Sequence, residues 1–144
     1  MQLDDLFGAP VLPARFDPAE KALAPKSRIN TSEDDANSLR MFLESVARGC
    51  PLSSFLSEST VILWLADADG NMIFSVEELF HRDDVTRRVP NNLELQYAEQ
   101  WQKLGHPSLV GAMPARIAGE MFVDPEEAGG TWVLSNKSGR YGLQ

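Results

Sequence analysis

Apolar side chains recur at three- and four-residue steps in the stretch that follows residue 31. These positions are Ala36, Leu39, Phe42, Leu43 and Val46. Thr31 and Ser32 precede them as candidate N-caps, and a glycine and a proline follow at Gly49 and Pro51. This pattern predicts an amphipathic helix over residues 32–48 and a short helical turn over residues 52–57.

Two pairs of strands are predicted from β-branched and aromatic runs. The first pair is TVILWL, residues 60–65, and residues 72–76, joined by an Asp-Gly-Asn turn. The second pair is residues 115–123 and 131–136, joined by the polar segment DPEEAGG. Each pair is expected to form an antiparallel hairpin.

A second long helix is predicted to begin at Asn91 or Asn92 and to end at Gly105. Its apolar positions fall on one helical face, and they are Leu93, Tyr97, Trp101 and Leu104. Before it, residues 77–81 are interpreted as a helical turn and residues 82–90 as a loop.

The first 30 residues contain four of the nine prolines and no sustained hydrophobic period. We expect an extended arm with one helical turn over residues 18–23, either docked on the body or bound to a partner. Residues 31–144 are then predicted to form a single α+β domain. It would consist of a small, mostly antiparallel sheet of two hairpins, packed by two main helices.

The segment DADGNMIFSVEEL, residues 67–79, has oxygen-bearing side chains at the spacing of a calcium-binding loop. However, Met72 occupies the sixth position, where such a loop requires glycine, and a strand-forming run precedes it in place of a helix. We therefore interpret the segment as the turn of the first hairpin and expect no metal site.

Charge and composition narrow the function classes further. The formal net charge of −8 argues against non-specific nucleic-acid binding. No apolar run is long enough to cross a bilayer, and the N-terminus lacks the pattern of a signal peptide. We therefore expect no membrane association and a cytoplasmic protein, with delivery to another cell left open.

Cys50 is the single cysteine and is expected to be a small, buried or half-buried side chain. The three tryptophans are expected in the core.

The segment 105-GHPSLVGAMPARIAGEMFVDPEEAGGTWVLSNKSGRY-141 carries the candidate chemistry. Ser138, Gly139, Arg140 and Tyr141 combine a hydroxyl, a flexible residue, a guanidinium and an aromatic ring, a set that suits an anionic or nucleotide-like ligand. His106 is a candidate acid, base or hydrogen-bond donor.

This segment resembles a module found in bacterial polymorphic-toxin C-terminal domains and in plant IQ-motif calmodulin-binding proteins. The matching positions are His106, Ser108, Leu109, Gly111, Ala118, Gly119, Glu120, Asn136, Ser138, Gly139 and Tyr141. Arg140 stands where the module usually has histidine, and no IQ motif is present, so calmodulin binding is not implied. The similarity is to the bacterial branch.

The resemblance implies a toxin- or effector-associated domain with a small ligand pocket, for which an ADP-ribosyltransferase-like arrangement using NAD is one hypothesis. His106 and Glu120 would then be catalytic, and Ser108, Ser138, Arg140 and Tyr141 would bind the ligand. The alternative is a non-catalytic acidic interaction protein, an immunity or adaptor partner, suggested by the net charge and the proline-rich arm. The same residues also allow a purely structural interpretation, with Arg140 paired to Glu120. Cofactor, protein partner and oligomeric state stay open.

Overall fold

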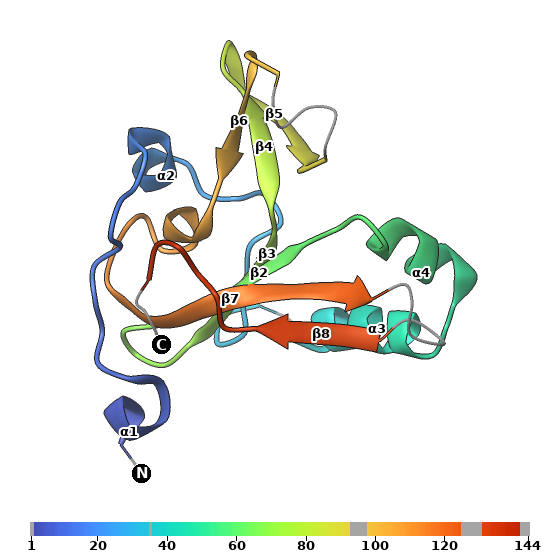
Figure 1. Ribbon diagram of the computed structural model, residues 1–144, viewed down its shortest axis with the longest axis horizontal. Coiled ribbons are helices and arrows are strands. Elements are labelled where there is room, and N and C mark those ends of the chain that lie inside the picture. Colours follow the sequence, from blue (N-terminus) through green and yellow to red (C-terminus); the bar gives the residue numbers. More distant parts are fainter. Residues whose placement is uncertain (1, 35, 93–97, 125–130, 142–144) are drawn as a thin grey trace.

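The fold consists of helices and two antiparallel sheets, in a computed structural model that describes residues 2–34, 36–92, 98–124 and 131–141 (Figure 1). The elements in chain order are α1 (Leu3–Phe7), α2 (Pro18–Ala22), β1 (Ile29–Asn30), α3 (Ala36–Ala47), α4 (Pro51–Ser57), β2 (Ile62–Asp67), β3 (Met72–Val76), β4 (Glu78–His81), β5 (Asp84–Pro90), β6 (Trp101–Leu104), the 3-10 helix η1 (His106–Leu109), β7 (Ala115–Asp124) and β8 (Thr131–Ser135). The α+β prediction is confirmed.

The larger sheet has the strand order β1-β3-β2-β7-β8 and contains both predicted hairpins. In β2–β3, Trp64 lies opposite Phe74, and in β7–β8, Met121 lies opposite Leu134. Strand β2 is central, and residues 62–66 are all buried because both faces of the sheet are covered there. The helices predicted at residues 32–48 and 52–57 are confirmed as α3 and α4, except that α3 begins at Ala36 because Thr31 and Ser32, the predicted N-caps, lie in a turn.

The two faces of this sheet pack against different parts of the chain. On one face, a buried cluster joins the sheet to η1 and the C-terminal segment; its members are Leu63, Leu65, Ile73, Leu109, Ala115, Ala118 and Tyr141. On the other side, α3 lies against β8, where Phe42 packs on Trp132 with ring centroids 6.2 Å apart. The indole Nε1 of Trp132 also donates a 2.9 Å hydrogen bond to the Leu43 carbonyl.

The second sheet, with strand order β5-β4-β6, corrects the prediction for residues 77–104. The helical turn at 77–81 and the loop at 82–90 are wrong, because these segments form the β4–β5 hairpin. The helix predicted up to residue 104 is wrong at residues 101–104, which pair with β4; residues 93–97 lie outside the described part. Strand β4, whose Leu79 and Phe80 are buried, pairs with both β5 and β6. This tertiary pairing overrides the helical spacing of Trp101 and Leu104.

Residues 2–30 run along the body of the molecule (Figure 1). Helix α2 confirms the helical turn predicted at residues 18–23. Val11 forms a bridge to Ala115, and the backbone N–H of Ala14 donates a 2.6 Å hydrogen bond to the carbonyl of Arg140. The described part of the arm is therefore docked on the strands and loops that follow it in sequence.

The segment that resembles a calcium loop forms the β2–β3 turn, as predicted. The Asp67 carboxylate accepts hydrogen bonds from the backbone N–H groups of Asp69 and Asn71, at 2.9 and 2.8 Å. Gly70 adopts a φ of +84°, which favours glycine. The acidic side chain at the start of the loop thus stabilises the turn itself.

The burial predicted for the tryptophans holds in part, and the burial predicted for Cys50 is wrong. Trp64 is buried and the other two tryptophans, Trp101 and Trp132, are half-buried. Cys50, expected to be at least half-buried, is exposed. It lies at the N-cap of α4, at the corner between α3 and α4, where the chain turns through solvent.

Candidate functional site

His106, at the start of η1, is held by both of its ring nitrogens. Its Nε2 lies 2.7 Å from the carbonyl oxygen of Gly119, and its Nδ1 lies 3.3 Å from Oγ of Ser138. Because a carbonyl can only accept, Nε2 carries the proton and donates to Gly119, and Nδ1 accepts from Ser138. Burial lowers the pKa of His106, so the ring is neutral at physiological pH.

The other residues of the C-terminal motif also form hydrogen bonds within the protein. Oγ of Ser138 accepts from the backbone N–H groups of Arg140 and Tyr141, at 3.2 and 3.3 Å. Ser108 donates to the carbonyl of Gly105 at 2.6 Å, and the Tyr141 hydroxyl donates to the carbonyl of Met113 at 2.8 Å. Burial raises the pKa of this phenol. These bonds attach residues 138–141 to the loop that contains η1.

Arg140 pairs with Glu20 of α2, which the sequence did not single out, and not with Glu120. Its Nη1 lies 2.6 Å from Oε1 of Glu20, whose side chain is 1% exposed. The same carboxylate accepts from the backbone N–H groups of Gly105, at 2.8 Å, and of Asp17, at 2.9 Å. The signal in the sequence was the capping-box spacing from Asp17 to Glu20, which indicates a helix start but does not reveal the long-range partners.

Glu120 lies apart from this hydrogen-bonded group. It sits on β7, opposite Leu63 on one side and Ser135 on the other. Partial burial, together with the nearby Glu77 carboxylate, raises the pKa of Glu120. Among the described residues, no hydrogen bond or ion pair joins Glu120 to the other five predicted site residues. The structure therefore brings His106, Ser138 and Arg140 together and leaves Glu120 outside their network.

Gly119 allows β7 to lie close to the Ser135 backbone and to the Trp64 ring. A Cβ atom at this position would lie 1.8 Å from the carbonyl oxygen of Ser135 and 2.7 Å from the Trp64 ring. The lack of a side chain at Gly119 therefore lets β7 lie close to the Ser135 backbone. It also sets the position of the carbonyl that accepts from His106.

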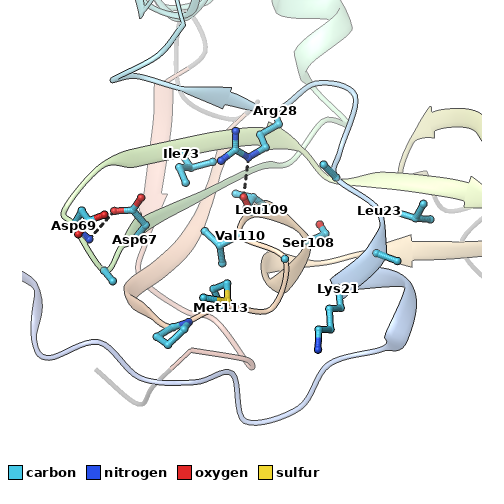
Figure 2. Close-up of a pocket in the computed structure, with 15 residues that line it drawn as sticks. Lys21, Leu23, Arg28, Asp67, Asp69, Ile73, Ser108, Leu109, Val110 and Met113 are labelled. Carbon is cyan, nitrogen blue, oxygen red and sulfur yellow. Dashed lines mark hydrogen bonds between the residues drawn. The ribbon is translucent and has the colours of Figure 1, made fainter.

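A pocket of about 510 Å³ lies between α2, the β2–β3 turn and η1 (Figure 2). Its polar lining comes from Lys21, Arg28, Asp67, Asp69 and Ser108. Ser108 is the predicted site residue that lines it, whereas Lys21 and Arg28 belong to the arm and were missed. Their type gave no signal, because isolated basic residues in a proline-rich stretch are usually solvated.

Arg28 is fixed in this pocket by one bond. Its Nε donates a 2.8 Å hydrogen bond to the carbonyl of Leu109, and the guanidinium lies above η1 in Figure 2. Within the described residues, no hydrogen bond or ion pair involves its two terminal nitrogens, so they remain available to a ligand. Lys21 and the carboxylate of Asp69 are also without described partners, and in Figure 2 they lie at other edges of the pocket.

The loop after η1 closes one wall of the pocket with an unusual backbone. Gly111 and Ala112 adopt φ values of +58° and +60°. For alanine this left-handed conformation costs about 1–2 kcal/mol. It persists because the Ala112 N–H donates a 2.8 Å bond to the carbonyl of Pro107 and the Ala112 side chain is buried.

In the described ranges, no three or more His, Cys, Asp or Glu side chains are grouped so that they could hold a metal ion. None of the described helices is both long and apolar enough to cross a membrane. No protein-family model matches the sequence, and neither the curated proteins nor the solved structures include a significant match.

Proposed function

We propose that this chain is a small-ligand-binding domain and that the pocket between α2, the β2–β3 turn and η1 takes an anionic ligand of about nucleotide size. The observation that carries this proposal is Arg28, which lines the pocket. Its Nε donates to the Leu109 carbonyl, and within the described residues no hydrogen bond or ion pair involves its two terminal nitrogens. A guanidinium in this position suits a phosphate or carboxylate group.

The size and lining of the pocket support the same ligand class. Its volume of about 510 Å³ lies within the range of roughly 300–1,000 Å³ that is usual for small-molecule sites. Ile73, Leu109 and Val110 supply an apolar floor on which a ring could lie. Asp69, at another edge, can accept hydrogen bonds from hydroxyl or amino groups of the ligand.

Binding, rather than acid–base catalysis, is the role that the geometry favours. A catalytic His106 would need a ring nitrogen within reach of a substrate, but both nitrogens are engaged by Gly119 and Ser138. An ADP-ribosyltransferase-like reaction would also need Glu120 at the ligand, and Glu120 does not line this pocket. The bacterial toxin or effector setting and the choice of NAD as a probe rest on the resemblance of residues 105–141.

Isothermal titration calorimetry with NAD, ATP and inorganic phosphate tests the proposal. We expect one of these anions to bind the wild-type chain and Arg28→Met to weaken that binding at least about tenfold, or about 1.4 kcal/mol. Arg40→Met is the matched control, because Arg40 is exposed on α3 and, among the described residues, forms an ion pair with Glu44 alone. No heat with any of the three anions, or unchanged binding to Arg28→Met, would contradict the proposal.

The second candidate function is a non-catalytic interaction protein, an immunity or adaptor partner. It is supported by large apolar side chains that are exposed on α3 and α4, such as Met41 at 66% and Phe55 at 74%. Growth arrest on expression of the wild-type chain alone, abolished by Arg28→Met, would count against this role. Harmless expression together with stable capture of one defined partner would favour it.

A further inference from the structure

Helix α4 exposes its apolar face and turns its serine face inward, which is the opposite of an ordinary surface helix. Leu52, Phe55 and Leu56 form a stripe at i, i+3 and i+4, and they are 70%, 74% and 60% exposed. Ser53 and Ser54 are half-buried and Ser57 is buried. A helix on the surface of a globular protein normally turns its apolar stripe inward, so α4 has its serines inside and its apolar side chains in water.

Hydrogen bonds of the inward-facing serines do not account for this orientation of α4. Oγ of Ser53 lies 2.7 Å from Oγ of Ser45, but the buried hydroxyl oxygens of Ser54 and Ser57 have no hydrogen-bond partner among the described residues. Buried hydroxyls without partners are costly, and so is an apolar stripe in water. Covering the α4 stripe would remove the second of these costs.

The α3–α4 part of the molecule also contains an apolar groove. It has a volume of about 300 Å³ and lies between α3 and the β3–β2 end of the large sheet. Its apolar lining comes from Ile29, Leu39, Phe42, Ile62, Phe74 and Val76. Leu39 and Phe42 belong to α3, which packs on α4, and Ile62 begins the strand that follows α4. One chain therefore carries both an apolar projection and an apolar recess.

The area involved favours reciprocal use of the two features. The three exposed side chains of the α4 stripe present roughly 400 Å², about half of the area that each partner buries in a standard stable interface. If each of two copies supplies its stripe and its groove, a two-fold axis doubles the buried area without any further contact. Neither the stripe nor the lining of the groove contains an ionisable side chain, so no charge would be buried by this contact.

We propose that the α3–α4 side is a homodimer interface, in which the α4 stripe of each copy enters the α3–sheet groove of the other. The charge of −8 on each copy opposes association at long range. Because salt screens this repulsion and the contact itself is apolar, added NaCl strengthens the dimer. This proposal is independent of the anion pocket.

Sedimentation equilibrium of the full chain between about 1 and 200 μM tests the proposal, since an interface of this size dissociates in that range. We expect a monomer–dimer equilibrium that Leu52→Asp weakens at least about tenfold. Leu12→Asp is the matched control, because Leu12 is 68% exposed on the arm, away from α4. A wild-type chain that stays monomeric, or a Leu52→Asp variant that dimerises like wild type, overturns the proposal.

A mixing experiment tests the reciprocal geometry. Leu39→Asp introduces a charge into the groove and, like Leu52→Asp, should yield monomers; circular dichroism checks that both variants are folded. Equal amounts of the two variants together can still form one intact stripe–groove contact, with Leu52 from one chain and Leu39 from the other. Partial recovery of dimer in the mixture supports the arrangement. No recovery, with both variants folded, overturns it in favour of a stripe-to-stripe contact.

Discussion

The guanidinium of Arg140 lies 2.6 Å from the carboxylate of Glu20, which is 120 residues earlier in the chain. Arg140 is 20% exposed and Glu20 only 1%, so the pair is largely removed from water. The carboxylate also accepts the N–H of Gly105, the residue before η1. A single buried side chain of the arm thus connects α2 to the C-terminal segment and to the loop that contains η1.

Replacing Glu20 by alanine should destabilise the protein by about 3 kcal/mol. The substitution removes the acceptor of the Gly105 N–H and the carboxylate partner of the Arg140 guanidinium, which keeps a 3.2 Å bond to the Arg15 carbonyl. Chemical denaturation measures the free energy of unfolding. Glu58→Ala is the control, because Glu58 is an exposed carboxylate at the end of α4 and should change stability by less than about 0.5 kcal/mol. Equal effects of the two substitutions would show that the Glu20 network contributes nothing.

Gly119→Ala should be among the most damaging small substitutions, at about 4 kcal/mol or more. The new methyl group would meet the backbone carbonyl of Ser135, which belongs to a paired strand and cannot move aside without breaking β7–β8 pairing. Gly139→Ala is the comparison, because the nearest atom to a Cβ there is 3.9 Å away. Thermal melting of both variants compares them, and a Gly119→Ala protein as stable as Gly139→Ala would contradict the packing described.

Local patterns predicted the elements that are stabilised locally. The apolar spacing in residues 36–47, the stop signal at Gly49 and Pro51, and the turn at Asp67 are local, so the body and end of α3 and the β2–β3 hairpin lie where they were predicted. The start of α3 at Ala36, four residues after the predicted start, was not predicted. Strand β6 is the opposite case. Trp101 and Leu104 are three residues apart, which is compatible with a helix, and only the available edge of β4 makes them a strand. The pairing partner is 20 or more residues away and leaves no local signal.

The candidate site divides in the same way. The segment 105–141 indicated side chains that the fold does bring together, because His106 and Ser138 share a hydrogen bond. The sequence could not show that their partners are backbone carbonyls and N–H groups, nor that the exposed nitrogens of the pocket belong to Arg28. Such pairings depend on how the arm lies on the body, which is set by distant contacts such as the one between Val11 and Ala115.

His106 should make the protein less stable as the pH falls below 6.5. Desolvation lowers its pKa in the folded state below the unfolded value of 6.5, so the unfolded chain takes up the proton first. The stability associated with the neutral ring is therefore fully present above pH 6.5 and is lost as the pH falls toward the lowered folded pKa. The loss reaches at most about 1.4 kcal/mol per pH unit for one proton.

Denaturation curves at pH 7.5, 6.5 and 5.5 measure this effect of His106. His106→Gln keeps a donor for the Gly119 carbonyl but does not titrate, so the difference between pH 7.5 and 5.5 should shrink. His81→Gln, which replaces the other histidine, is the comparison variant. Glu120 contributes with the opposite sign, because its raised pKa gives stability that is lost as the pH rises through the folded value. A pH dependence that is unchanged in His106→Gln would argue against a buried neutral ring.

Cys50 should react with alkylating agents at lower pH than an ordinary thiol. The backbone and hydroxyl of Ser53, and then the hydroxyl of Ser45, hydrogen-bond the thiolate and lower the pKa of Cys50 to about 7. Iodoacetamide rates on the folded chain should be half-maximal near pH 7, whereas the urea-unfolded chain should follow a free thiol near 8.5. Ser53→Ala removes the hydroxyl bond but keeps the backbone bond, so its midpoint should lie between these two values. Identical pH profiles for the folded and unfolded chains would show that the corner between α3 and α4 does not stabilise the thiolate.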